Sequence, residues 1–104
     1  MGVERDLLRF EPPHPGEYLK HDILPALGMT ITQLADHLGV SRASLSELVN
    51  GNRSVSLEMA QRLGQAFKNG TRFWMTLQMQ RDIWLAERDS EIVVKPVRRN
   101  SRAA

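Results

Sequence analysis

The sequence predicts an all-α fold, a five-helix domain that contains a helix-turn-helix. Apolar residues recur at i, i+3, i+4 and i+7 over residues 31–38 and again over 60–67, which is the spacing of a buried helix face. Gly39 separates the first of these stretches from a second helix that starts shortly afterwards. Glycines and prolines divide the rest of the chain into segments of helical length, and 104 residues suit one small domain.

The first helix is expected to start at Pro15 and to stop before Gly28. Proline at the first helical position costs no hydrogen bond, because the N–H it lacks has no partner at a helix start. Glu17 then places an acidic side chain beside the positive end of the helix dipole. Pro25 and Gly28 are expected to end this helix.

The next two helices form the predicted helix-turn-helix. Thr30 and Gln33 have the spacing of a capping box, in which each side chain pairs with a backbone N–H of the first turn. Gly39 is expected to stop this helix, because glycine adopts a left-handed backbone without steric cost. Ser41 is a second N-cap candidate, so the following helix is expected to run from Arg42 to about Asn50.

Two further helices are expected after residue 55. Ser56 is a cap candidate for the fourth helix, which Asn69 and Gly70 are expected to end. Thr71 is expected to cap a fifth helix that runs to about Glu87.

The helix from Arg42 has one apolar side and one polar side. Leu45, Leu48 and Val49 are expected to point inward, which leaves a small, polar outer face. Such a face suits the major groove of DNA, where we expect Arg42 to pair with guanine, Glu47 to accept from cytosine and Ala43 to contact a thymine methyl group. Helix ends and the following turn would meet phosphates through Gln33, Ser41, Ser44, Asn50 and Arg53. Two amphipathic helices around a glycine also occur in bundles that do not bind DNA.

The fifth helix carries more apolar surface than one core requires. Phe73, Leu77 and Trp84 are expected to face the core. A nearly opposite stripe is expected to contact a second subunit and consists of Met75, Met79, Ile83 and Ala86. The alternative is that the apolar residues of the C-terminal tail fold back over this stripe.

The charge distribution separates a basic C-terminal tail from the rest of the chain. Four of the 14 basic side chains follow the last acidic residue, so residues 1–94 carry a net charge of −2. We expect an N-terminal arm over 1–13, the helix-turn-helix DNA-binding domain over 14–88 and the basic tail over 89–104. Ile92, Val93 and Val94 are β-branched and precede Pro96, which indicates an edge strand in the tail.

Several function classes are excluded by composition. The chain has no cysteine, and its three histidines lack metal-site spacing, so neither a metal nor a cofactor is expected. No nucleophile motif or phosphate loop is present, so we expect neither an enzyme nor a small-molecule substrate. The start of the chain does not resemble a signal peptide and no apolar run has membrane-spanning length, so a cytoplasmic protein with no membrane partner is expected.

The segment from His14 to Phe67, continuing through TRFWMTLQMQRDIW, resembles the HigA/VapI-type antitoxins. The matching motifs are HPGE at residues 14–17, LGVSR at 38–42, Asn50-Gly51, Phe73-Trp74 and DIW at 82–84. The resemblance implies a five-helix Xre/lambda-repressor-like domain with a short extended tail, from a bacterial cytoplasmic protein that is nucleoid-associated when bound to DNA. It also implies a homodimer, a palindromic operator in the module's own promoter and a HigB/RelE-like ribonuclease toxin as partner.

The family's recognition positions correspond to Ser41, Arg42, Ala43, Ser44 and Glu47, with Asn50 and Arg53 near the DNA backbone. Two alternatives stay open at this point. One is a stand-alone Xre-type transcriptional regulator without a toxin partner. The other is a protein-binding module whose helix-turn-helix does not read DNA.

Overall fold

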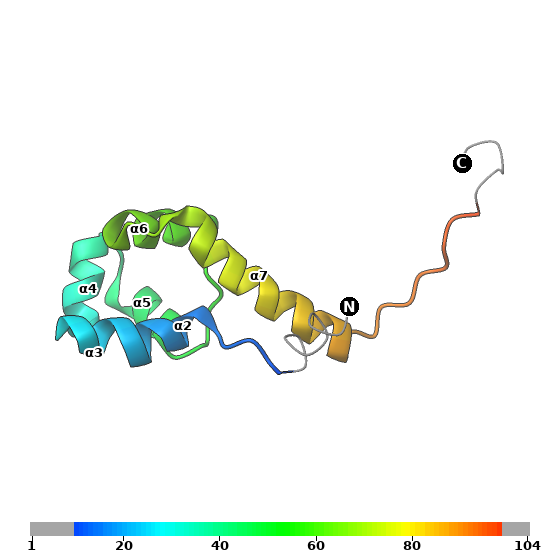
Figure 1. The fold of residues 1–104 in the computed structure, drawn as a ribbon, viewed down its shortest axis with the longest axis horizontal. Helices are drawn as coiled ribbons and strands as arrows, with labels where there is room; N and C mark the ends of the chain where they lie inside the picture. The colour runs from blue at the N-terminus through cyan, green and yellow to red at the C-terminus, as the bar shows by residue number, and fades with distance from the viewer. Residues whose placement is uncertain (1–9, 99–104) are drawn as a thin grey trace.

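The computed structural model describes residues 10–98, and within them it contains five helical segments and no strand (Figure 1). The first segment consists of α2 (Pro15–Tyr18), η1 (Leu19–Ile23) and α3 (Leu24–Leu27), which follow one another without a break. Residues 1–9 of the expected N-terminal arm lie outside the described residues, as do Arg99 and Arg102 of the basic tail.

Pro25 does not end the first helix, contrary to our expectation, because the helix continues to Leu27 and stops at Gly28. The preceding turn, η1, is wound as a π-helix in which the Leu24 N–H donates to the carbonyl of Leu19. Proline has no N–H to donate to the carbonyl four residues earlier, and its ring crowds that carbonyl. A single wide π turn accommodates such an insertion without breaking the helix.

The two helices of the helix-turn-helix have the predicted ends. α4 (Ile31–Leu38) begins with the capping box of Thr30 and Gln33, and α5 (Arg42–Val49) begins at Ser41, whose hydroxyl accepts from the Ser44 N–H at 3.1 Å. Gly39 ends α4 in the left-handed conformation, with φ 73°. The sequence therefore specifies these boundaries through residues that lie at the boundaries themselves.

The last two helices are α6 (Leu57–Phe67), capped by Ser56 as predicted, and the long α7 (Gly70–Asp89). Thr71 does not cap α7, because the helix already begins at Gly70 and the N-cap residue is Asn69. The Asn69 side chain accepts instead from the indole N–H of Trp74 at 2.8 Å. This bond fixes the orientation of the largest buried side chain.

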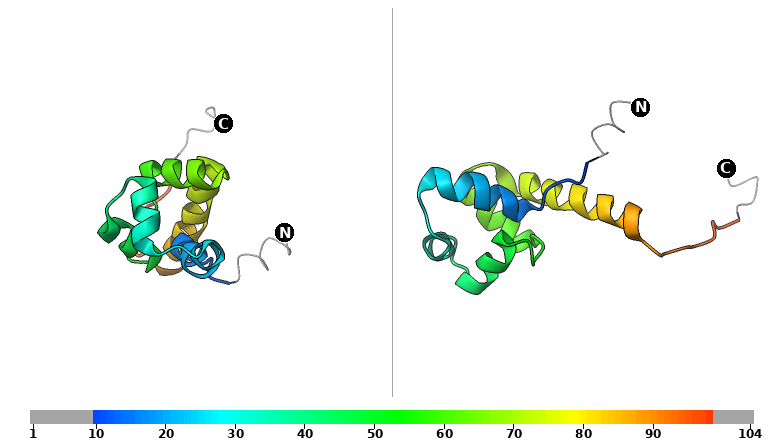
Figure 2. Two further views of the ribbon diagram at one scale, coloured as in Figure 1. Left: turned by 90° about the vertical axis from the view of Figure 1, so that its left-hand side faces the viewer. Right: turned by 90° about the horizontal axis from the view of Figure 1, so that it is seen from below.

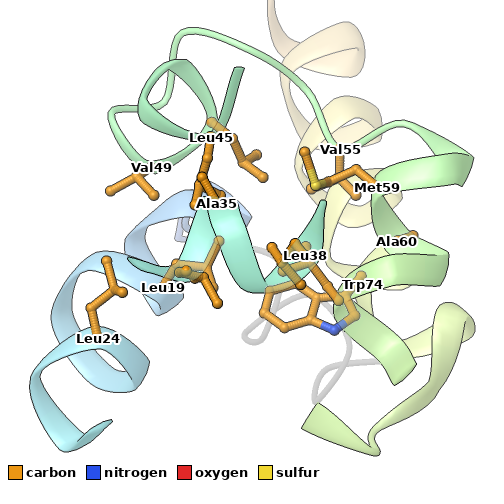
Figure 3. Packing of buried hydrophobic residues seen from close by; sticks show 13 residues of the cluster. Leu19, Leu24, Ala35, Leu38, Leu45, Val49, Val55, Met59, Ala60 and Trp74 are labelled. Carbon is orange, nitrogen blue, oxygen red and sulfur yellow. The ribbon is translucent and has the colours of Figure 1, made fainter. Parts of the chain in front are cut away.

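The hydrophobic core lies between α4, α5, α6 and the first half of α7, with Leu19 and Leu24 closing it from the first helix (Figure 3). Trp74 is fully buried within it. None of the helices within residues 10–98 is long and apolar enough to cross a membrane.

The inward face of α7 differs from our expectation by one position. Trp74 and Gln78 are the buried residues of this helix, whereas Phe73 is 36% exposed and Trp84 is half-buried. Leu77 packs against the edge of the core, as does Met75, which was expected on the outer stripe. The helix is apolar on several sides, so its sequence alone does not define which side is covered.

The tail beyond α7 is extended and exposed, and it points away from the helices (Figures 1 and 2). Residues 90–98 form no strand, so the strand expectation is wrong, because these residues find no second strand with which to pair. They also do not fold back over α7, since Ile92, Val93 and Val94 are each at least 79% exposed.

Candidate nucleic-acid interface

The turn between α4 and α5 is closed by backbone hydrogen bonds and by a side chain from α6. The Val40 N–H donates to the Ala35 carbonyl at 3.0 Å, which is the bond pattern of a glycine-terminated helix. Arg62 Nη1 donates to the Leu38 carbonyl at 2.7 Å and places a positive charge at the negative end of α4. Sequence reasoning missed Arg62, because its partner is 24 residues away along the chain.

The polar outer face of α5, which we call the recognition face, is exposed, as predicted. Arg42, Ala43, Glu47 and Asn50 are exposed on it, whereas Leu45, Leu48 and Val49 are buried beneath it. The helix is therefore held by its apolar side and presents its polar side outward.

The start of α5 lies beside the start of α4. Arg42 Nε donates to the Thr32 hydroxyl at 3.0 Å, which brings Arg42 next to the predicted phosphate contact Gln33. Ser41 and Ser44 lie at the N-terminus of α5, where their hydroxyls hydrogen-bond each other at 2.8 Å. Two helix N-termini and one arginine thus gather at one edge of the face, where they suit anionic groups.

Glu47 and Arg53 form an ion pair at the other edge. Their closest N–O distance is 2.7 Å, and both side chains are about half exposed, so water screens their attraction. The pair links Arg53, which lies in the loop after α5, to the outer face of α5. Asn50, by contrast, is turned back on its own helix, since its amide donates to the Ser46 carbonyl at 2.9 Å.

The loop that carries Arg53 is anchored to α7 by a buried glutamine. Gln78 is 5% exposed, and its Oε1 accepts from the Val55 N–H at 2.8 Å while its Nε2 donates to Asp82 at 2.9 Å. Both polar ends of this buried side chain are therefore paired. The sequence contains no local signal for this contact, because Val55 is 23 residues before Gln78.

His14 attaches the first helix to the same loop. Its Nδ1 accepts from the Gly16 N–H at 2.9 Å, which caps α2, and its ring also hydrogen-bonds the Arg53 backbone. Burial lowers the pKa of His14, and the positive charge of Arg81 lowers it further. The histidine of the HPGE motif is thus a neutral structural link behind the recognition face.

Gly16 is required by the close approach of α2 to α5. A Cβ atom at this position would lie 1.9 Å from the Leu48 carbonyl oxygen, which is far inside van der Waals contact. The first helix therefore packs directly on the C-terminal end of α5 and limits its movement.

The second half of α7 presents an exposed apolar surface. Met79 is 54% exposed, Ile83 is 48% exposed and Ala86 is also exposed, whereas Met75 packs against the core. Three of the four residues expected at a dimer interface thus lie on an open face. Residues 10–98 contain no cluster of three acidic or histidine side chains that would bind a metal ion.

The fold and this exposed polar helix define a helix-turn-helix protein. The chain belongs to the Helix-turn-helix family, whose model matches residues 22–74. It is 48% identical over 73 residues to virulence-associated protein A′ of Dichelobacter nodosus, covering 69% of this chain and 63% of that protein. It is 36% identical over 73 residues to antitoxin HigA-1 of Vibrio cholerae, covering 70% of this chain and 69% of that protein.

Solved structures have the same fold. An antidote protein of a plasmid maintenance system from Nostoc punctiforme matches with a TM-score of 0.73 and 42% identity, over 76% of this chain and 86% of that one. PA4674 of Pseudomonas aeruginosa, solved in complex with a 28-bp operator DNA, matches with a TM-score of 0.70 and 36% identity, over 72% and 82%. The resemblance to HigA/VapI-type antitoxins is confirmed by these matches.

Proposed function

We propose that the protein is an antitoxin that binds operator DNA as a homodimer, represses its own promoter and neutralises a HigB/RelE-like ribonuclease toxin. The observation that carries the DNA-binding part is the polar face of α5, which is exposed while the rest of the helix is buried. The solved complex of PA4674 with its operator supports the same use of this fold. The name of antitoxin HigA-1 supports the toxin partner.

The face fits the major groove in shape and in chemistry. A groove about 12 Å wide admits one helix, and the small side chain of Ala43 permits close approach to a thymine methyl group. Arg42 is the reader of guanine, and the Thr32 hydroxyl, 3.0 Å from its Nε, restrains the guanidinium before DNA arrives. Restraint of a long side chain reduces the entropy that binding must remove.

The surrounding residues position the helix on the phosphate backbone. We assign this role to the N-terminal contacts of α4 and α5 and to the turn after α5, through Gln33, Ser41, Ser44, Asn50 and Arg53. Arg53 changes partner on DNA in this scheme, from Glu47 to a phosphate, which leaves Glu47 to accept from a cytosine amino group. Asn50 must likewise leave its bond to Ser46.

The dimer contact is assigned to the exposed part of α7, where Met79, Ile83 and Ala86 form an open apolar stripe. A twofold dimer places its two α5 helices in successive major grooves, about 34 Å apart, so the operator is a palindrome. Occupation of that operator blocks the promoter. Met79→Asp is expected to yield a monomer in sedimentation, and an unchanged dimer would contradict this contact.

Operator binding is tested by titrating the protein against the DNA upstream of its own gene, with scrambled competitor and varied salt. Arg42→Ala is expected to lower affinity by about tenfold or more and to relax the preference at one base pair. Lys20→Ala is the matched control, because it removes the same charge from an exposed side chain outside α4 and α5. Equal binding of wild type and Arg42→Ala to both DNAs would refute the role of Arg42.

The toxin part has a separate test. If the adjacent gene encodes a small basic ribonuclease, its expression alone is expected to stop growth, and co-expression of this protein is expected to restore it. Specific operator binding without such a toxin would instead identify a stand-alone regulator.

A further inference from the structure

A groove between the first helix and α7 is lined mainly by apolar side chains, together with two acidic residues and two histidines. Pro13, Tyr18, Phe73 and Leu77 line it, and its volume is about 460 Å³. The rings of Tyr18 and Phe73 stand 5.7 Å apart and are each more than one third exposed. Glu17 and Asp22, both exposed, supply negative charge to the same groove.

The C-terminal segment, residues 91–98, has the complementary chemistry. Its four β-branched apolar side chains are 79–92% exposed: Ile92, Val93, Val94 and Val97. Lys95 and Arg98 interleave positive charge with these side chains. The described part of the chain thus contains a mainly apolar groove with two acidic residues and an exposed apolar segment with basic residues.

We propose that in the homodimer the C-terminal segment of each protomer packs into the α2–α7 groove of the other protomer. This inference rests on the homodimer of the proposed function. The apolar side chains of the segment cover Tyr18 and Phe73, while Lys95 and Arg98 lie beside Glu17 and Asp22. Apolar burial supplies most of the affinity, because exposed ion pairs contribute little.

The direction of the chain at the end of α7 favours the groove of a second copy. Ser90 ends α7 in an extended conformation, with φ −68° and ψ 136°, so the chain continues outward. Gly28 and Gly39, in contrast, end their helices in the left-handed conformation that turns a chain sharply. To reach its own groove, the segment would have to reverse and run back about 20 Å from Ser90 to the level of Leu77.

If the dimer forms through the exposed stripe of α7, the C-terminal segment of one protomer starts close to the groove of the other protomer. Two antiparallel α7 helices that meet around Met79 and Ile83 bring the partner's Ser90 beside Arg72, next to the groove residue Phe73. Nine extended residues, 90–98, span about 30 Å, which is enough to cross α7 and reach Tyr18. Pro96 fits such a path, because an extended segment on a helix surface needs no ladder hydrogen bond.

Engineered disulfides test this arrangement directly, because the natural chain has no cysteine. Tyr18→Cys and Val94→Cys are prepared as separate full-length proteins with tags of different mass, then mixed and oxidised. A covalent heterodimer on a non-reducing gel is expected. Gln61→Cys, an exposed position on α6, replaces Tyr18→Cys in the control mixture and is expected to give none.

A doubly substituted chain, carrying Tyr18→Cys and Val94→Cys together, distinguishes the two possible grooves. Loss of free thiols without a covalent dimer would show that the segment occupies its own groove, which overturns the proposal. A chain that sediments as a dimer but forms no cross-link would also overturn it while leaving the homodimer intact. A monomeric wild-type chain would overturn both.

Removal of the segment gives an independent measurement. A chain truncated after Ser90 is expected to fold with unchanged helical circular dichroism and to have a dimer dissociation constant raised by about tenfold or more. An unchanged dissociation constant would contradict the proposal.

Discussion

Replacement of Gln78 by leucine is expected to lower the free energy of unfolding by about 2–3 kcal/mol. Leucine has a similar size, so the substitution removes two hydrogen bonds without leaving a large cavity. The Val55 N–H, 2.8 Å from Gln78 Oε1 in the buried interior, would lose its acceptor. The Asp82 carboxylate is exposed and would pair with water instead.

Most of the expected loss of stability comes from the buried backbone N–H of Val55. An unsatisfied backbone N–H away from water costs about 1–3 kcal/mol, whereas the lost bond to the exposed Asp82 adds at most about 1 kcal/mol. The apolar surface of leucine offsets part of this cost through its own burial. The loop that carries Arg53 would also lose its anchor on α7, so operator affinity is expected to fall together with stability.

Urea unfolding followed by circular dichroism measures the change. With a urea dependence of about 1–3 kcal/mol per molar for a small domain, the midpoint is expected to fall by about 0.7–3 M. Gln80→Leu makes the same chemical change at an exposed position of α7, where an effect within about 0.5 kcal/mol is expected. Equal midpoints for Gln78→Leu and Gln80→Leu would refute the reasoning.

Three further changes test other contacts behind the recognition face. Gly16→Ala is expected to lower the melting temperature by more than about 10 °C, because its Cβ would collide with the Leu48 carbonyl. Calorimetry measures this change, and a fall in melting temperature of less than about 2 °C would contradict the close packing of α2 on α5. Arg62→Ala leaves the Leu38 carbonyl without its donor, so the free energy of unfolding in urea is expected to fall by about 1 kcal/mol and operator binding to weaken. Unchanged stability and affinity would show that the Arg62 hydrogen bond does not support the turn. The pKa of His14 is lowered in the folded protein, so the unfolded chain binds more protons below about pH 6.5 and stability falls as the pH drops through and below that value. His14→Asn retains a capping oxygen and is expected to flatten this decline between pH 7.5 and 5.5; an equal decline in both proteins would exclude His14 as its source.

The helix boundaries were predictable wherever a boundary depends on neighbouring residues. Thr30 and Gln33 cap each other three positions apart, and Gly39 ends its helix by its own backbone freedom. The polar face of α5 was predictable for the same reason, since the helical period alone separates Arg42 and Glu47 from Leu45.

The buried face of α7 and the contacts that support the recognition face could not be predicted, because they depend on how helices far apart in the sequence pack together. α7 comes so close to α6 that a Cβ at Gly64 would lie 2.4 Å from the Gly70 backbone, and in this packing Trp74 rather than Phe73 is buried. The supports of the recognition face, Arg62 and Gln78, have partners more than 20 residues away. A single sequence contains no local pattern for such pairs.

Under the proposed function, the ion pair of Glu47 and Arg53 has a consequence for how the protein finds its operator. In the free protein, Glu47 opposes the attraction of Arg53 for any phosphate. In the proposed complex, a phosphate alone offers a new partner to Arg53 and leaves Glu47 without one, whereas an operator with a cytosine at the matching step offers a new partner to both residues. Because the genome presents about 10⁶ or more competing sites, weak binding to them shortens the residence time of the protein on non-operator DNA.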